Sequence, residues 1–288
     1  MGLANVSILR LGHIIAAAII GTLCTSCASR LPQLSPQSGT PATGEEAGFV
    51  YLTAARQRCS LEPMTGEAVI NGTIGKEPIN GRFSFAAADR QLRLESVGRN
   101  AGDLVFTADE DTDAFMYRGA YVIGGKRVDV IETILGLSLD PQDLRQVLTA
   151  CPDVSGSLDG LHFGDRWFQV RVDGQAGYAV SFQLTNDGRG WIIRAIDGPI
   201  AGTTNRWRAE YGSESNGLPR SVHVVSTTWA GTPGEQFDVR LSLRQIRVNV
   251  QLPAETFGLG RSLSIPTTDL ESLRRSRPRS APLLVDPR

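Results

Sequence analysis

The sequence contains little of the chemistry that most enzymes use. It has three histidines in 288 residues, and it lacks both the Gly-x-Ser-x-Gly turn of serine hydrolases and a glycine-rich phosphate loop. His162 lies near a turn, and His223 alternates with Val222 and Val224 in a strand-like segment, so both are interpreted as structural. We therefore expect no enzymatic activity and no cofactor, and an envelope hydrolase is the least favoured alternative.

The chain also lacks an excess of charge and a set of metal ligands. Its formal net charge is −1, so it has no basic surface of the kind that nucleic-acid binding requires, and we expect no nucleic-acid partner. An acidic cluster runs from Asp109 to Asp113 but lacks the glycine and the distal glutamate of calcium-binding loops. We interpret this cluster as the tip of a hairpin and expect no metal site.

A signal-peptide pattern occupies the N-terminus. Arg10 precedes the apolar run Leu11 to Leu23, which is short for a membrane span but has the length of a signal-peptide core. Thr25-Ser26-Cys27 then resembles a lipobox, in which small residues precede the cysteine that receives lipid (palmitate or a similar acyl group). We expect a lipoprotein signal peptide over 1–26 and lipidation at Cys27; the alternative is an uncleaved membrane anchor. Ala28 follows instead of aspartate, and the resemblance to the usual lipoprotein sorting signal then implies the periplasmic face of the outer membrane in a Gram-negative host.

Cysteine is scarce after this segment. Once Cys24 leaves with the signal peptide and Cys27 carries lipid, only Cys59 and Cys151 remain. An isolated pair in an oxidising compartment favours a disulfide bond, and two buried free thiols are the alternative. Neither cysteine has a nearby histidine with which to form a zinc site.

Composition divides the rest of the chain into three parts. Residues 27–48 hold the lipidated cysteine and a stretch rich in Pro, Ser, Thr and Gly, which predicts a flexible linker. Residues 49–268 are expected to form one folded domain. Residues 269–288 are polar and proline-rich, with four arginines between Arg274 and Arg279, and are predicted to be a disordered tail.

Hydrophobic periodicity predicts a mainly β domain. A short helix is expected at 49–58, and period-two alternation then indicates strands. The first set of strands is 68–74, 81–86, 91–95, 104–107 and 114–117. Helical spacing predicts two helices, at 128–135 and 141–150, the second capped by Asp140 and opened by Pro141. The second set of strands is 166–172, 178–184, 190–196, 205–211, 221–227, 237–243 and 246–250. We expect a curved antiparallel sheet with the helices across its concave face and an apolar pocket between them.

Several motifs resemble the LolA/LolB lipoprotein-localisation family. The likeness lies in Leu92-Arg-Leu-Glu95, in Gly102 to Phe106, in Tyr117 and in the long stretch Val130 to Pro152. Within that stretch, one helix ends in Leu135-Gly136 and the next reads Pro141-x-x-Leu144-Arg145. Phe257 and Pro266 resemble the last strand of the family. The likeness covers roughly residues 58–153 by motif and the second half of the chain by strand order.

The resemblance implies a fold and a function. The fold would be an incomplete, strongly curved antiparallel β-barrel capped by two or three short helices. It would hold acyl chains of lipoproteins or phospholipid without enzymatic chemistry, and a periplasmic carrier protein would be its partner. A Cys59–Cys151 disulfide would fasten the helical cap to the sheet. The alternative function is a non-transporting interaction subunit of a cell-envelope complex that keeps the fold.

The resemblance also suggests site residues. In the family, the loop after the Leu-x-Leu strand exposes an apolar residue to the membrane, and Val97 is the residue of that loop that fits this role. An ordinary apolar core is the alternative interpretation of the side chains expected to line the cavity. These side chains are Phe83, Phe85, Leu92, Leu94, Phe106, Phe115, Tyr117, Ile131, Ile134, Leu135, Leu144, Leu148, Phe168, Phe182 and Trp191.

Overall fold

The structure is a computed structural model, and the part of it described below belongs to the unit Leu34–Arg288. The described residues are 34, 38–98, 103–153, 156–173, 177–212, 214–215, 217–228, 237–259, 264–276 and 282–283. Cys27, the expected signal peptide and most of the expected linker lie outside these residues. Among the helices within the described ranges, none has the length and apolar character needed to cross a membrane.

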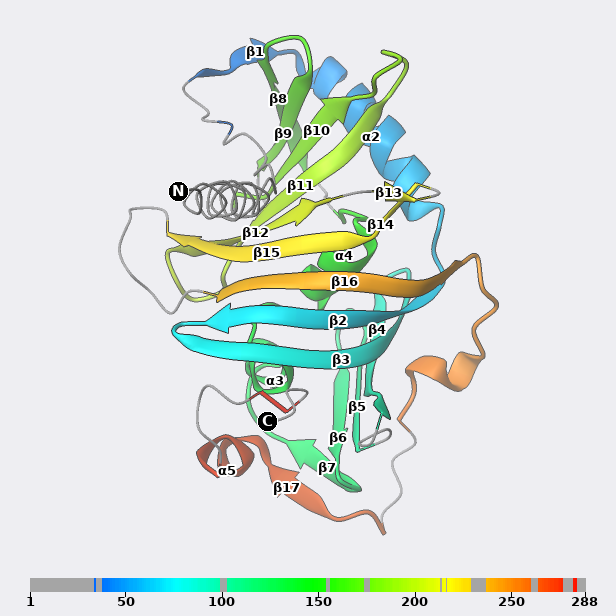
Figure 1. The fold of residues 1–288 in the computed structure, drawn as a ribbon, viewed down its shortest axis with the longest axis vertical. Helices are drawn as coiled ribbons and strands as arrows, with labels where there is room; N and C mark the ends of the chain where they lie inside the picture. The colour runs from blue at the N-terminus through cyan, green and yellow to red at the C-terminus, as the bar shows by residue number, and fades with distance from the viewer. Residues whose placement is uncertain are drawn as a thin grey trace, which may run out of the picture. The chain divides into compact units, whose positions relative to one another are not determined.

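An antiparallel meander forms the first half of one large sheet (Figure 1). Its strands are β2 (Met64–Ile74), β3 (Glu77–Ala88), β4 (Gln91–Ser96), β5 (Leu104–Ala108), β6 (Asp113–Tyr117) and β7 (Ala120–Ile123). Burial alternates along β4, where Leu92 and Leu94 are buried and Arg93 and Glu95 are only half-buried. This alternation follows from the period of two in the sequence, because successive side chains point to opposite faces of a strand.

A second meander continues the same sheet. Its strands are β8 (Ser157–Phe163), β9 (Trp167–Asp173), β10 (Ala179–Leu184), β11 (Trp191–Pro199), β12 (Asn205–Tyr211), β15 (Ser221–Thr228) and β16 (Phe237–Val248). The long strand β16 pairs with β2, with Leu241 opposite Ile70, and thereby joins the two halves. The strand order is β1-β8-β9-β10-β11-β12-β15-β16-β2-β3-β4-β5-β6-β7-β17. The expected open, curved antiparallel sheet is therefore confirmed.

Short strands form both edges of the sheet. β1 (Thr40–Ala42) pairs with β8, and β17 (Thr267–Asp269) pairs with β7 in parallel. A separate small hairpin joins β13 (Glu214–Ser215) to β14 (Leu218–Pro219). With three residues each, the edge strands offer little free backbone for pairing with another chain.

Within the described residues, four helices and a 3-10 turn (Ala254–Phe257) accompany the sheet. The helices are α2 (Gly44–Cys59), α3 (Arg127–Leu135), α4 (Pro141–Thr149) and α5 (Leu270–Arg275). α4 begins as its sequence predicts, because the Asp140 side chain accepts a hydrogen bond from Gln142 N at 2.9 Å. α3 ends at Gly136, which has the left-handed φ of 75° that favours glycine. Figure 1 shows α3 and α4 behind the central strands, on one face of the sheet.

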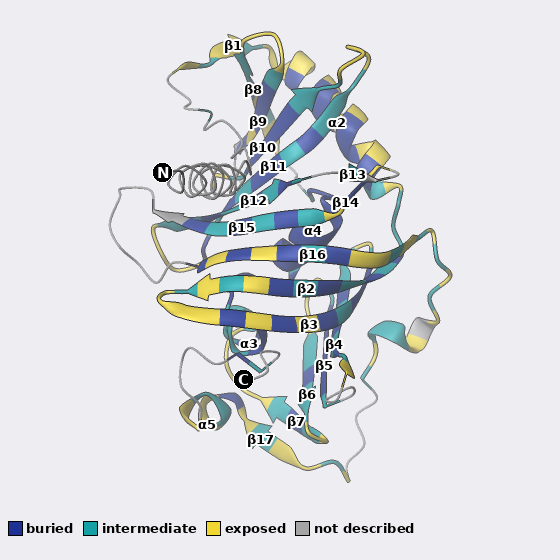
Figure 2. Ribbon diagram, viewed as in Figure 1, coloured by how far each residue is buried: buried dark blue, intermediate teal, exposed yellow. Residues whose placement is uncertain are grey.

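The structure corrects several expected boundaries. The two strands expected at 237–243 and 246–250 are one strand, β16, with a bulge between Arg244 and Arg247. The expected linker 27–48 is folded from β1 onward, because Thr43 caps α2 by accepting a hydrogen bond from Glu46 N. Part of the expected tail 269–288 is also folded, since α5 buries Leu270. Figure 2 shows that the exposed parts of β2 and β3 lie toward the hairpin that joins them.

Candidate functional site

The apolar residues expected to line a cavity come together on one face of the sheet. All of them are buried in one apolar cluster except Tyr117 and Trp191, which are partly buried and pack against it. Phe83, Phe106 and Ile134 are each 0% exposed. The structure therefore places these side chains in one apolar cluster, and that they line a cavity stays a prediction.

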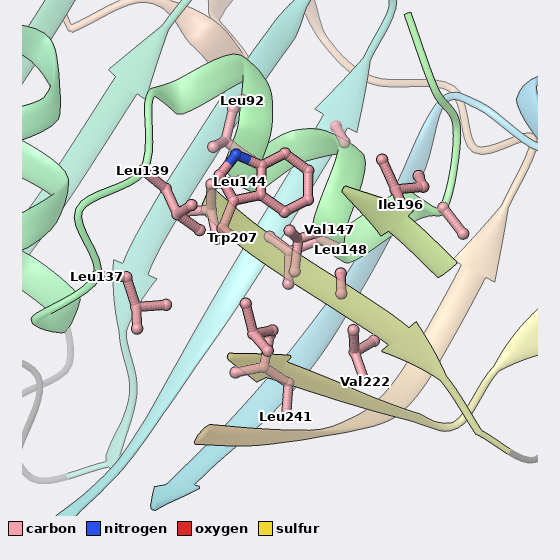
Figure 3. Close-up of a cluster of buried hydrophobic side chains, with 14 of the residues drawn as sticks. Leu92, Leu137, Leu139, Leu144, Val147, Leu148, Ile196, Trp207, Val222 and Leu241 are labelled. Atoms are coloured by element: carbon pink, nitrogen blue, oxygen red, sulfur yellow. The ribbon is translucent and has the colours of Figure 1, made fainter. Parts of the chain in front are cut away.

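Helix α4 covers the centre of this face. Figure 3 shows Leu144, Val147 and Leu148 of α4 close to Trp207 of β12, with Val222 and Leu241 of the neighbouring strands beneath them. All six side chains are at most 1% exposed. Helix α4 therefore closes one side of this apolar cluster, which is called here the concave cluster.

The concave cluster comprises the predicted cavity residues together with Leu137, Leu139, Val147, Ile196, Trp207, Val222 and Leu241. Trp207 lies on a strand that the sequence predicted, and it joins the predicted cavity residues in this cluster. Leu137 and Leu139 were missed because they lie in the connection between α3 and α4, where no periodicity marks them. Trp207 packs flat on Gly198, where a Cβ atom would lie 2.6 Å from the indole ring. A glycine opposite a tryptophan on neighbouring strands was the available signal for this contact.

Polar groups lie beneath α4 as well. The Tyr178 hydroxyl donates a hydrogen bond to the Asp143 carboxyl group, which is 6% exposed. Burial raises the pKa of Asp143 to about 7, and the Tyr178 hydrogen bond opposes part of this shift. The nearby Trp207 Nε1 also lowers the Asp143 pKa. Trp207 Nε1 and Gln146 Oε1 are both buried, and neither has a hydrogen-bond partner among the described residues. The interface under α4 is therefore not purely apolar.

Helix α4 is tied to its surroundings at several points. Arg145 Nη1 lies 2.6 Å from Glu62 Oε1, and both side chains are nearly buried. Burial raises the pKa of Glu62, and the charge of Arg145 opposes that shift. The Tyr211 hydroxyl donates to the backbone oxygen of Gln146 at 2.9 Å. These contacts hold α4 against the sheet and against the segment before β2.

A disulfide bond fixes the end of α4. It joins Cys59 at the end of α2 to Cys151 just after α4, as the cysteine count suggested. Nearby, the Tyr51 hydroxyl donates to the backbone oxygen of Pro152 at 3.0 Å. The end of the cap is thus linked to α2, which itself packs on β8 and β11.

Helix α3 is attached through more exposed contacts. Arg274 of α5 lies 3.5 Å from Asp129 and 3.4 Å from Glu132, and all three side chains are about one-third exposed. Leu283 N donates to the backbone oxygen of Thr133 at 3.0 Å. Solvent-exposed ion pairs of this kind contribute little stability. Arg127 at the start of α3 also donates hydrogen bonds to the backbone oxygens of Glu110 and Asp109. The ion pairs of α3 are nevertheless more exposed than the Arg145–Glu62 pair of α4.

Pockets lie at the margins of the domain. One of about 500 Å³ adjoins the disulfide and includes Glu62, Arg90 and Arg145 in its lining. Another, of about 320 Å³, lies beside β2, β3 and β4. A third, of about 120 Å³, lies between α2, β11 and the β13–β14 hairpin, with Trp191 in its wall. In this closed arrangement these pockets do not reach between α4 and Trp207.

The two histidines and the acidic cluster singled out from the sequence make contacts that stabilise the fold. His162 Nε2 lies 2.9 Å from Glu46, and His223 Nε2 lies 2.7 Å from Asp238. The Asp109 carboxyl group accepts hydrogen bonds from Asp111 N and Thr112 N, as in a tight hairpin turn. Within the described ranges, no group of histidine, cysteine or acidic side chains has the arrangement of a metal site.

Val97 lies at the start of the loop that was expected to face the membrane. Its side chain is half-buried, and residues 99–102 of this loop lie outside the described residues. The large apolar side chains that the described structure exposes are elsewhere, at Phe49, Leu52 and Ile123.

Comparisons with known proteins support a fold but assign the chain to no sequence family. No protein-family model matches the sequence, and no curated protein sequence matches it. A LolA superfamily protein from Nitrosomonas europaea is similar in structure, with a TM-score of 0.54 and 9% identity over 74% of this chain and 97% of that one. A DUF1329 family protein from Desulfovibrio piger has a TM-score of 0.48 at 10% identity, covering 75% of this chain and 98% of that one. A putative outer membrane lipoprotein-sorting protein domain from Vibrio parahaemolyticus has a TM-score of 0.43 at 8% identity, covering 75% and 97%.

Proposed function

We propose, from the premise that this chain has a LolA/LolB-like fold, that it is an envelope lipoprotein which binds acyl chains. In this proposal Cys27 carries the lipid anchor, and the protein lies on the periplasmic face of the outer membrane. The bound amphiphile is a lipoprotein or a phospholipid, taken up without covalent chemistry. A periplasmic carrier protein is the expected source or recipient of this amphiphile.

The concave cluster is the observation that carries the proposal. It forms a continuous apolar layer on one face of an open sheet. The two short helices α3 and α4 cover this layer. Acyl chains gain about 0.8 kcal/mol for each methylene moved from water to such a surface, so binding needs no charged site.

Uptake requires the cap to move, and the contacts indicate which helix moves. α4 is held by the disulfide and by the nearly buried Arg145–Glu62 pair. α3 is held by the more exposed ion pairs of Arg274 and by the hydrogen bonds of Arg127, with no covalent link among the described residues. We therefore assign the movement to α3, with Gly136 as the joint between the two helices. An acyl chain would then enter beside Ile131 and Ile134 of α3, while α4 stays in place.

The closed cluster also supports a second candidate function. Side chains such as Phe83, Phe106 and Phe182 are fully buried against their neighbours, as in an ordinary core. A protein that keeps this core closed would act as an interaction subunit of an envelope complex and would carry no lipid. The two candidates differ in what accompanies the purified protein.

Native mass spectrometry with lipid extraction, on the full-length processed protein purified from its envelope, distinguishes them. The lipid-binding proposal predicts a co-purifying phospholipid or acylated peptide, which Ile134→Asp removes. Ile123→Asp is the matched control, because Ile123 is an exposed isoleucine on β7 outside the concave cluster. Both variants are first compared with the wild type by thermal unfolding. A lipid-free mass together with a stoichiometric protein partner would favour the interaction subunit.

A further inference from the structure

Two exposed apolar side chains lie together on the outer side of α2. Phe49 is 68% exposed and Leu52 is 47% exposed. Residues three apart in a helix point to the same side, so the two form one surface, called here the α2 outer face. When large, exposed apolar side chains occur together, they often mark a surface that contacts another molecule or a membrane.

The opposite side of α2 is fixed, so this exposure is not relieved by rotation of the helix. Val50, Tyr51 and Ala54 are buried on the domain. The helix also packs closely on β8, where a Cβ atom at Gly160 would lie 3.1 Å from that of Ala47. Its last residue, Cys59, is in the disulfide bond. The α2 outer face therefore points away from the domain permanently.

The chain connects this face to the proposed anchor over a short distance. β1 is paired with β8 and leads directly into the N-cap of α2 at Thr43. Between Cys27 and β1, the chain can span at most about 45 Å when fully extended. A membrane that holds the acyl chains of Cys27 is thus always within reach of α2, and the tether gives it a high effective concentration.

The charges on α2 indicate what kind of contact is made. Glu45 and Glu46 lie in the first turn, and Arg56 is exposed in the last turn, so the helix offers no cationic patch to anionic headgroups. A contact through Phe49 and Leu52 depends on burial of apolar area in the boundary between headgroups and acyl chains. Such a contact is insensitive to salt and to the content of anionic lipid.

We propose that the α2 outer face rests on the lipid surface to which Cys27 tethers the domain. This inference rests on the lipid anchoring in the proposed function, and it assigns an orientation to the anchored domain. The N-terminal half of α2 faces the bilayer. α5 and Ile123, at the other edge of the sheet, do not take part in the contact.

Polarity-sensitive fluorescence tests this orientation. Acylated full-length protein carrying Phe49→Cys, Leu52→Cys or Ile123→Cys is labelled with nitrobenzoxadiazole at the new cysteine and reconstituted on phosphatidylcholine vesicles. Vesicle flotation and the mass of the processed N-terminus confirm anchoring in each sample. We expect a blue shift, a severalfold gain in intensity and quenching by doxyl lipids at positions 49 and 52, with none of these at position 123. Adding phosphatidylglycerol or salt leaves the signals unchanged.

Three results would overturn the inference, and they are distinguishable. Acylated protein that floats with vesicles, but whose probes at 49 and 52 behave as the probe at 123, would refute the membrane contact while leaving the anchor intact. A blue shift that appears without vesicles and increases with protein concentration would show that a second copy covers the α2 outer face. A processed mass without acyl chains would refute the anchor as well as the contact.

Discussion

At the scale of single residues, Asp143 of α4 is expected to make the stability of the protein depend on pH. Its carboxyl group lies beneath α4, and the charged groups and polar side chains that act on it are Tyr178, Asp140 and Trp207. Burial is the largest cause of its raised pKa, so the folded protein favours the neutral form of this side chain. The Tyr178 hydroxyl, whose own pKa is raised by burial and by Asp143, remains a hydrogen-bond donor.

Asp143→Asn is expected to reduce the pH dependence of stability. The unfolded chain loses the Asp143 proton near its ordinary pKa of 3.8, whereas the folded protein keeps it until about 7. The free energy of unfolding therefore falls by roughly 4 kcal/mol at most as the pH rises through this interval. Above the interval, the contribution of Asp143 no longer changes with pH. Urea unfolding at several pH values measures this slope. Equal slopes for the wild type and Asp143→Asn between pH 4 and 7 would contradict the assignment.

Gly136 is the residue at which backbone conformation and packing coincide. Its φ is 75°, and a Cβ atom there would lie 1.8 Å from Ile74 Cδ1, whereas Gly75, with a φ of 59°, has nothing within 4 Å. Gly136→Ala is therefore expected to lower the free energy of unfolding by more than Gly75→Ala, which pays about 1–2 kcal/mol for the left-handed backbone alone. Denaturant titration of both variants measures the difference, and equal losses would show that Ile74 moves aside.

At the scale of secondary-structure elements, the disulfide connects α2 to α4. Replacing both Cys59 and Cys151 by serine is expected to lower stability, because the bond closes a loop with a sequence separation of 92 residues. The chain-entropy estimate is about 4–5 kcal/mol, and measured losses are often smaller. Comparison of the double variant with the wild type by thermal unfolding checks this, and an unchanged melting temperature would contradict it.

The attachment of α3 gives a prediction about local opening. Arg274→Ala removes both ion pairs to α3, so amide hydrogens of α3 are expected to exchange faster while those of α4 keep their protection. Arg275→Ala is the matched control, because Arg275 pairs with Glu271 within α5 and is 78% exposed. Hydrogen exchange followed by mass spectrometry measures both helices. Equal acceleration of α3 and α4 would show that the cap opens as one body.

Elements with strong local patterns were predictable, and others were not. Asp140-Pro141 marked the start of α4, and alternation marked β4. β1 and β17 were missed because a three-residue strand shows no periodicity, and their pairing depends on distant partners. β16 was divided in two because Gln245, at a φ of 51° in the bulge, interrupts the alternation.

At the scale of the whole molecule, the fold class followed from the order of strands and helices. The pairing of β16 with β2, which joins the two halves of the sheet, leaves no local mark in the sequence. The predicted cavity residues join one apolar cluster, whose packing brings together side chains from strands and helices far apart in the sequence and is a property of the folded state. Whether that face opens is the point on which the proposed function depends.

Photo-crosslinking with a diazirine-bearing fatty acyl probe, followed by peptide mapping, tests the central claim most directly. The full-length wild-type protein is labelled in its oxidised form, with Ile134→Asp as the variant that places a charge under α3. Acyl-chain binding in the concave cluster predicts crosslinks on α3 and on the facing strands β3 to β6, and their loss in Ile134→Asp. Crosslinks confined to the outer surface, or equal labelling of both proteins, would contradict acyl-chain binding in the concave cluster.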